Sequence, residues 1–286
     1  RDGESLAAAA AGCDALVHTA ALVAVWRRDP AEFDAVNVGG LLNAIAAVER
    51  HRIPRLVYTS SFLARPPAGQ SRAPRWNDYQ RTKSAAAVEA DAAVERGVPL
   101  ISLFPGVIYG PGRQTEGNLV GRQIADHLAG RLPGIVGASR VWSFSYVEDV
   151  AAAHVAALER GVPGRCYQLG GVNAPQMRAY EIIRDLTGRR LPRRLPPWLV
   201  AVLAAAEEAR VSLTGGTPLL TTGTLEILLR DWPLTHDLAE AELDYRVTPL
   251  EEGLTRVLAE LDHRRASRES SSDGGPADSG DRTVRI

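Results

Sequence analysis

A tyrosine and a lysine stand four residues apart in Tyr79-Gln-Arg-Thr-Lys83. Residues 77–96 have the pattern of a helix, so this spacing places both side chains on one helix face. A free tyrosine has a pKa near ~10 and is a poor acid or base at neutral pH. A neighbouring ammonium favours the phenolate and lowers that pKa. The pair could therefore carry a proton to or from a carbinol oxygen.

Lys83 is the only lysine in a chain that otherwise uses arginine for its positive charge. A lysine placed at random would follow one of the seven tyrosines by four positions in about 7 of 286 placements, roughly 2–3%. Lysine supplies a compact ammonium with three donors that can also reach ribose hydroxyls, which arginine does less well. A solvated helix face is the alternative interpretation, but the single retained lysine favours a function.

Two serines follow an apolar run of strand length. Ser60 and Ser61 come directly after residues 55–59. In open α/β sheets ligands bind at the carboxyl ends of the strands. A hydroxyl there could hydrogen-bond the substrate oxygen that Tyr79 protonates. The alternative is a serine pair that caps a turn.

Three other polar residues are ambiguous from the sequence. Asn37 lies on the apolar stripe of a predicted helix, and a buried amide needs partners. It could hold a backbone carbonyl or a water beside Lys83, or tether the helix to a strand. His18 and His154 are interpreted as satisfied structural groups.

The elements that must position these residues follow the order β-α-β-α-β. The strands are continuous apolar runs, which predicts a parallel sheet covered on both faces. Asp29-Pro-Ala-Glu32 resembles a helix start, and Gly97 ends the later helix. The predicted strands are 14–19, 55–59 and 98–104, and the predicted helices are 29–52 and 77–96. Residues 62–76 and 104–112 are predicted loops.

The second half of the chain changes character after Gly112, where helical segments dominate. We expect helices near 118–130, 147–160, 176–187, 197–210, 217–230 and 249–262, with strands near 142–145 and 166–169. Residues 1–112 are thus predicted to belong to a doubly wound domain, and 113–263 mainly to a smaller, mostly helical lobe, with 142–170 returning to the sheet. Residues 264–286 offer little to bury and are predicted to be disordered.

Composition excludes several classes of protein. The net charge is −1, which argues against a nucleic-acid partner. Cys13 and Cys166 are too few for a disulfide scaffold, and neither the cysteines nor the six histidines have metal-ligand spacing. The longest apolar run, 198–206, is far shorter than the ~20 residues of a membrane span. We therefore expect a cytoplasmic protein without metal or membrane partner.

These pieces together resemble the extended short-chain dehydrogenase/reductase superfamily, also called the NAD-dependent epimerase/dehydratase family. Within it, residues 104–112, Gly117-Asn118, 130–134 and 196–199 are most similar to dihydroflavonol-reductase-like and farnesol-dehydrogenase-like members. The resemblance covers roughly residues 1–262 in the right order. It is carried by Val17-His-Thr-Ala-Ala21, Asn37-Val-Gly-Gly40, Tyr58-Thr-Ser-Ser61, Tyr79-Gln-Arg-Thr-Lys83, Pro105-Gly-Val-Ile-Tyr-Gly-Pro-Gly112, Phe144-Ser-Tyr-Val-Glu-Asp-Val150 and Thr248-Pro-Leu-Glu-Glu-Gly253.

The resemblance implies a Rossmann-like fold and a role for each matching residue. Tyr79 would be the proton donor and acceptor, and Lys83 would lower its pKa and bind the nicotinamide ribose. Ser61 would orient the substrate oxygen, and Asn37 would support the proton relay. The hydride must come from the nicotinamide, since no side chain can supply one. The residues implied to border the cofactor are Ala20, Ala21, Asn37, Tyr79, Lys83, Phe104, Pro105, Gly106 and Val107.

The chain departs from the family pattern at its start. The family's glycine-rich turn, which seats the pyrophosphate at a helix N-terminus, would precede Arg1. We therefore expect an N-terminally truncated sheet. The cofactor is expected to be NAD or NADP, with a slight preference for NAD. The residues that read the ribose 2′ position follow a strand that this chain does not contain.

Three functions are compatible with these observations. The first is an NAD(P)-dependent oxidoreductase that transfers a hydride between the cofactor and an alcohol or carbonyl group of a small, fairly apolar substrate. The second is a nucleotide-sugar epimerase or dehydratase, for which the chain offers Arg113, Arg122, Arg131 and Arg140 to a pyrophosphate. The third is a truncated, non-catalytic fragment that cannot bind cofactor. A homodimer is compatible with each.

Overall fold

A computed structural model describes residues 2–112 and 119–272 of the chain. Its main sheet has four parallel strands in the order β1-β2-β3-β6. They are β1 (Leu16–His18), β2 (Leu56–Thr59), β3 (Leu100–Pro105) and β6 (Cys166–Leu169). The prediction of a parallel α/β sheet is confirmed, and the carboxyl ends of all four strands lie at one edge.

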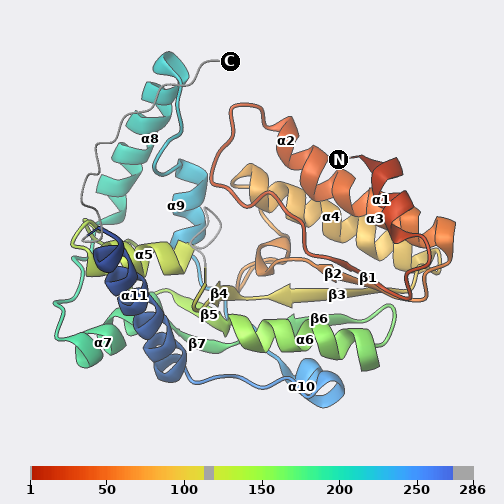
Figure 1. Cartoon of the computed structure of the whole chain (residues 1–286). Coiled ribbons are helices and arrows are strands. Elements are labelled where there is room, and N and C mark those ends of the chain that lie inside the picture. Colours follow the sequence, from red (N-terminus) through yellow and green to blue (C-terminus); the bar gives the residue numbers. More distant parts are fainter. Residues whose placement is uncertain (1, 113–118, 273–286) are drawn as a thin grey trace, which may run out of the picture.

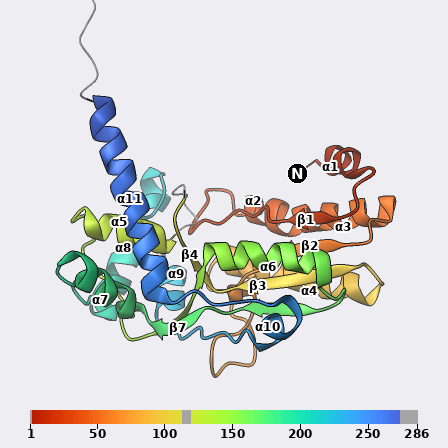
Figure 2. The same ribbon diagram turned by 60° about the horizontal axis from the view of Figure 1, so that its bottom comes forward.

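Helices cover both faces of this sheet (Figures 1 and 2). Helices α1 (Gly3–Ala10), α3 (Gly39–His51) and α4 (Asp78–Glu95) lie on one face, and α6 (Val147–Arg160) and α10 (Asp237–Leu243) lie on the other. Successive strand residues point to opposite faces. Along β2, Leu56 and Tyr58 therefore pack against α3 and α4, while Val57 packs against α6 and α10. This double burial explains why β2 is mostly apolar, whereas in the edge strand β1 Val17 is 42% exposed.

One helical stretch, Ala31–His51, has the length and apolarity of a membrane span, and 39% of its most apolar window is buried in the protein. A core helix passes the same test. The buried residues of this stretch pack in the core against the main sheet, which explains its apolar composition. They include Leu41, Ala44, Ile45 and Val48. A cytoplasmic location stays a prediction.

The helix predicted over 29–52 is interrupted by a wider turn. A short α2 (Ala31–Phe33) leads into the π-helical turn η1 (Asp34–Val38), and α3 continues from there. The expected start is confirmed in part, since the Asp29 carboxylate accepts a hydrogen bond from the Ala31 N–H at 3.0 Å. The π turn was not predicted, because its hydrogen bonds depend on packing and not on the local pattern.

A second, three-stranded sheet was largely missed from the sequence. It contains β4 (Val107–Tyr109), β5 (Val141–Tyr146) and β7 (Val172–Pro175), with β4 and β5 parallel and β5 and β7 antiparallel. Residues 104–112, predicted as a loop, therefore contain the end of β3 and all of β4. The short strands β4 and β7 are stabilised by their partner β5, which no local pattern reveals.

The C-terminal lobe is mostly helical, as predicted. Its core packs Ile124, Trp142, Ile183, Leu225 and Leu254 together. The helices are α5 (Leu119–Leu128), α7 (Gln176–Thr187), α8 (Pro197–Thr214), α9 (Thr222–Leu228) and α11 (Leu250–Ser272). The domain boundaries themselves stay predictions.

The segment predicted to be disordered from residue 264 begins as helix. Helix α11 continues through Ser272. Ion pairs one turn apart favour this continuation, and Arg264 pairs with Glu260 at 2.6 Å. The rest of the predicted tail, 273–286, lies outside the described residues.

Candidate functional site

The candidate site lies where the carboxyl ends of the parallel strands meet helix α4. Strand β2 ends at Thr59, and its carbonyl oxygen accepts a hydrogen bond from Lys83 Nζ at 3.0 Å. Strand β1 ends beside it, with His18 in register with Tyr58. The structure thus brings the lysine of one helix to the end of a strand more than twenty residues earlier.

A side chain caps the N-terminus of helix α4 and so fixes where the helix that carries Tyr79 and Lys83 begins. Asn77 Oδ1 accepts a hydrogen bond from the Gln80 N–H at 2.8 Å, which satisfies a free donor of the first turn. Tyr79 and Lys83 follow on the same helix, one turn apart. The Lys83 side chain is only 3% exposed. Burial disfavours its charged form and lowers the pKa of Lys83 to about 8.

Tyr79 lies beside Ser61, as the sequence-based assignment requires. The tyrosine is half-buried and packs against the core of the C-terminal lobe. Burial raises the pKa of Tyr79, and its contact with the Ser61 side chain lowers that pKa in part. Lys83 is not among the causes of this shift, so the expected lowering of the Tyr79 pKa by Lys83 is not seen in this structure. Ser61 also caps the short helix η2 (Phe62–Ala64), where its Oγ accepts from the Leu63 N–H at 3.2 Å.

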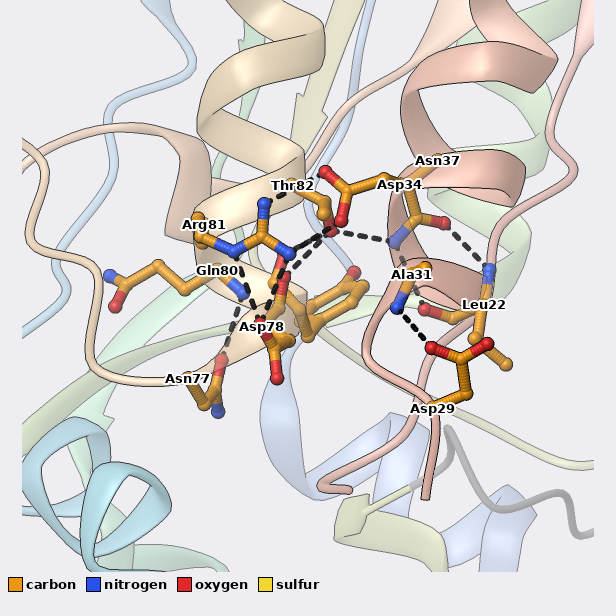
Figure 3. A network of polar contacts seen from close by, with 11 residues as sticks. Leu22, Asp29, Ala31, Asp34, Asn37, Asn77, Asp78, Gln80, Arg81 and Thr82 are labelled. Carbon is orange, nitrogen blue, oxygen red and sulfur yellow. Dashed lines mark hydrogen bonds and ion pairs between the residues drawn. The ribbon is translucent and has the colours of Figure 1, made fainter. Parts of the chain in front are cut away.

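Asn37 makes three hydrogen bonds from the π turn η1 (Figure 3). Its Oδ1 accepts from the Leu22 N–H at 2.7 Å, and its Nδ2 donates to the Leu22 carbonyl at 3.2 Å and to Thr82 Oγ1 at 3.0 Å. Asn37 thus ties the segment after β1 to helix α4. These contacts match the tether alternative and place the amide one residue from Lys83 along α4.

An ion pair joins the same two helices on the solvent side (Figure 3). Arg81 donates two hydrogen bonds to Asp34, at 2.8 and 2.6 Å, and a third to Asp78 at 3.1 Å. The hydrogen bonds with Arg81 lower the pKa of the Asp34 carboxyl. This pair fixes η1 against α4 from the outside, while Asn37 and Thr82 fix it from the inside.

The residues implied to border a cofactor occupy two places at the sheet edge. Ala20 and Ala21 follow β1, where Ala20 is exposed and Ala21 half-buried. Phe104 and Pro105 end β3 and are buried, with the Arg65 guanidinium 4.3 Å from the Phe104 ring centroid. Val107 begins β4, the first strand of the second sheet, and Gly106 directly precedes it. A Cβ on Gly106 would lie 2.5 Å from the Ser143 carbonyl oxygen, so packing between strands already requires glycine there.

His18 departs from the expectation of a satisfied structural histidine. Its ring stacks on Tyr58 with 5.9 Å between centroids. Its Nε2 is buried and has no hydrogen-bond partner among residues 2–112 and 119–272. Burial and the charge of Lys83 lower the pKa of His18 to about 4. The sequence contains one indication of this, because His18 is a polar residue at the end of a predicted buried strand. His154 fits the expectation, with Thr59 Oγ1 and the Val150 carbonyl each 2.7 Å from its ring nitrogens.

A metal site was not expected. The part of the chain that the structure describes contains no cluster of three or more His, Cys, Asp or Glu side chains that could hold an ion.

The fold agrees with that of known proteins. The model of the NAD dependent epimerase/dehydratase family matches residues 1–170, which is more than half of the chain. The chain belongs to this family. The family match includes the residues of the candidate site, from His18 to Lys83, and the whole main sheet through β6.

Relatives of this epimerase/dehydratase family member include proteins of several substrate classes. It is 30% identical over 219 residues to the sterol demethylase protein B of Methylococcus capsulatus, covering 73% of this chain and 66% of that protein. It is 28% identical over 224 residues to a candidate dihydroflavonol 4-reductase of Synechocystis, covering 72% of this chain and 64% of that protein. The chain thus spans just under two thirds of the length of these relatives.

Solved structures of the family share the fold. The crystal structure of gox2253 superposes with a TM-score of 0.76 at 26% identity, covering 92% of this chain and 82% of that one. The UDP-glucuronic acid 4-epimerase of Bacillus cereus gives a TM-score of 0.71 at 16% identity, covering 92% and 81%. The second likeness concerns the fold alone.

Proposed function

We propose that this protein is an NAD(P)-dependent oxidoreductase that reduces a carbonyl, or oxidises an alcohol, of a small and fairly apolar molecule. The observation that carries the proposal is the convergence of Tyr79, Lys83 and Ser61 at the carboxyl edge of the sheet. Lys83 Nζ donates a hydrogen bond to the Thr59 carbonyl oxygen at 3.0 Å. Tyr79, one turn earlier on helix α4, contacts the Ser61 side chain. Family membership supports the same activity.

Each of the three side chains has a distinct task in this proposal. Tyr79 holds the proton that moves to or from the substrate oxygen, because its hydroxyl faces Ser61. Ser61 orients that oxygen by a hydrogen bond. Lys83 stabilises the phenolate when it forms, since the charged ammonium favours the anion. The nicotinamide cofactor, when bound, supplies or accepts the hydride.

The residues of this chain are suited to hold the nicotinamide ribose of such a cofactor. Lys83 has three N–H donors, of which one goes to Thr59 in this structure. Its remaining donors suit ribose hydroxyls. His18 Nε2, buried at the same edge without a partner in the described ranges, is a second polar group available there. The sequence contains no Gly-x-x-Gly-x-x-Gly turn, so we assign no residue of this chain to the pyrophosphate.

The surroundings of Ser61 and Tyr79 support an apolar substrate. Phe62 follows Ser61 directly, and its ring meets Trp232 edge-on with 5.4 Å between centroids. Trp76, three residues before Tyr79, meets Trp232 in the same way at 6.3 Å. Trp232 is buried in the core, while Phe62 and Trp76 are half-buried and are the aromatic residues next to Ser61 and Tyr79 along the chain.

The substitution Tyr79→Phe tests the assigned proton transfer. We expect turnover to fall by at least about a hundredfold, because the general acid is lost, while cofactor Kd changes little. Tyr180→Phe is the matched control, since Tyr180 is a buried phenol of the C-terminal lobe. The measurement is the absorbance of reduced nicotinamide with a panel of apolar ketones and aldehydes. Unchanged turnover in Tyr79→Phe would contradict the role.

Cofactor binding tests the proposal independently of the substrate. Titration with NADH and with NADPH, followed by nicotinamide fluorescence, should show saturable binding of one of them. A ligand that binds the native state also raises the melting temperature. If neither cofactor binds nor shifts the melting curve, the third function, a non-catalytic chain, replaces this proposal.

The second candidate function, a nucleotide-sugar epimerase or dehydratase, would need arginines to bind the substrate pyrophosphate. The structure supports it less well, because two of the four arginines already form ion pairs. Arg131 pairs with Asp126 at 2.7 Å, and Arg140 pairs with Asp231 at 3.4 Å. Arg113 lies outside the described residues, and Arg122 has an interaction within the protein. Net hydride transfer to free cofactor would separate the two activities, because an epimerase returns the hydride to its own product.

A further inference from the structure

Helix α8 is apolar on two opposite sides, but the residues that the structure describes cover only one of them. The covered side contains Val200, Ala204 and Val211, which are buried. At about 100° per residue, the opposite side is formed by six apolar residues. These are Trp198, Val202, Ala205, Ala206, Ala209 and Leu213, all exposed. We call this set the α8 stripe.

The α8 stripe is large and free of charge. From Trp198 to Leu213 it extends about 22 Å along the helix axis. Trp198 is 69% exposed and Leu213 is 86% exposed. The charged residues of the helix are engaged off the stripe, since Glu208 accepts from the Thr222 N–H at 2.8 Å and Arg210 pairs with Glu207 at 2.7 Å. Scattered exposed apolar residues are ordinary, whereas a contiguous stripe indicates a contact surface.

The elements that the structure describes leave the α8 stripe open. Figure 1 shows the helix at the periphery of the C-terminal lobe, with α9 beside it. Among the described elements, α9 is the one that makes extended contact with α8. The stripe lies on the helix side opposite the residues buried there.

Four arginines precede the helix and are fixed close to its N-terminal end. They are Arg189, Arg190, Arg193 and Arg194, and all are exposed. Within the ranges that the structure describes, none of them forms an ion pair with a carboxylate. Their segment is anchored, because Ile135 N–H donates to the Arg193 carbonyl and Leu195 N–H donates to the Ile135 carbonyl, each at 2.8 Å. Four positive charges with no ion pair in the described ranges thus precede Trp198 by four to nine residues along the chain.

We propose that the α8 stripe and these four arginines dock the protein on an anionic lipid surface. A helix that lies in the membrane interface combines an apolar face, a tryptophan and neighbouring basic residues that attract anionic headgroups. An anionic lipid surface would cover the stripe and supply negative charge to all four arginines at once, and a second copy of the chain is the alternative that the test below distinguishes. The proposal goes beyond the oxidoreductase function and revises the expectation of no membrane partner.

Binding to vesicles tests the proposal without any substrate or cofactor. The purified chain is sedimented with vesicles of phosphatidylcholine alone and of phosphatidylcholine mixed with phosphatidylglycerol. We expect binding to the mixed vesicles, weakened by salt. The variant Arg189→Gln/Arg190→Gln should bind at least about tenfold more weakly. Arg50→Gln/Arg96→Gln, with guanidinium side chains 56% and 53% exposed, is the control of equal charge and should bind as the parent does.

The apolar contribution is tested with a second matched pair. The test variant Trp198→Gln/Val202→Gln replaces two stripe residues that are 69% and 61% exposed. The control variant Val88→Gln/Val155→Gln replaces two apolar residues outside the stripe that are 66% and 55% exposed. Only the α8 pair should lose vesicle binding, with unchanged melting temperatures for both. Absence of binding to mixed vesicles, or equal effects of the two pairs, would overturn the proposal. A dimer in light scattering that the α8 pair converts to a monomer, without lipid binding by the parent, would show a second copy as the occupant.

Discussion

At the scale of the residue, the candidate site is notable for the polar groups it buries. Lys83 is 3% exposed, and its pKa is lowered to about 8 because burial disfavours the ammonium. His18 is 8% exposed, and its pKa is lowered to about 4. Placing such groups in the interior costs stability at neutral or acidic pH. Both groups lie at the carboxyl ends of β1 and β2, where His18 stacks on Tyr58 and Lys83 donates to the Thr59 carbonyl.

His18 should make the protein sensitive to acid. Its pKa is about 6.5 when unfolded and about 4 when folded. Between these values the unfolded state binds more protons, so stability falls as pH drops from 6.5 towards 4. The loss amounts to about 3 kcal/mol for a shift of this size. Urea unfolding of His18→Gln across this pH range should show a flatter dependence than the parent.

An exposed residue without a titratable group provides the comparison for that experiment. Val155→Gln, at a residue 55% exposed, should leave the acid dependence as it is in the parent. A parent protein whose stability is the same at pH 4 and pH 6.5 would show that His18 titrates normally in the folded state.

At the scale of the element, the π turn η1 and helix α4 act as one unit. The wider turn carries Asn37 into the interior, where it bonds both backbone groups of Leu22 and the hydroxyl of Thr82. Asp34, three residues earlier, stays on the solvent side and binds Arg81. The helix that carries Tyr79 is thus fixed by a buried amide and an outer ion pair.

These two attachments should differ in strength. Asn37→Ala leaves the Leu22 N–H and carbonyl without partners, which should cost about 2–3 kcal/mol of unfolding free energy. Asp34→Ala should cost no more than about 1 kcal/mol, because the Arg81 and Asp34 side chains are 32% and 46% exposed. Chemical denaturation of both variants provides the measurement. A larger loss for Asp34→Ala would reverse this order.

At the scale of the whole molecule, the two sheets meet through close backbone packing. The chain passes from β3 to β4 at Gly106 and from β6 to β7 at Gly171. A Cβ on Gly171 would lie 1.7 Å from the Phe144 carbonyl oxygen, so the strand of one sheet excludes any side chain there. The junction that connects the sheet to the C-terminal lobe thus depends on glycine.

Gly171→Ala should therefore destabilise the whole molecule by about 3 kcal/mol, since the backbone must move to accept the methyl group. Gly39→Ala is the control, because the nearest atom to its Cβ would be 3.7 Å away. Alanine in that helix should be neutral or slightly stabilising. Thermal unfolding of both variants tests the comparison, and equal melting temperatures would contradict it.

Much of the fold could be predicted because its signals are local. The bounds of α6, α7 and β6 follow from apolar periodicity and turn residues close to those predicted. Strands β4 and β7 and the turn η1 escaped prediction, because a short strand or a π turn is stable only against its partners. The disorder predicted from residue 264 also ignored the helical ion pairs of α11.

The sequence by itself determined the helical spacing of Tyr79 and Lys83 and the order of motifs that marks the family, because both are written along the chain. Only the tertiary structure decided that Ser61 reaches Tyr79, that Asn37 bonds Leu22 and Thr82, and that His18 is buried without a partner in the described residues. It also decided that the described residues leave one apolar side of α8 uncovered. Periodicity is a property of neighbouring residues, whereas burial and pairing depend on strand register and helix packing between distant segments.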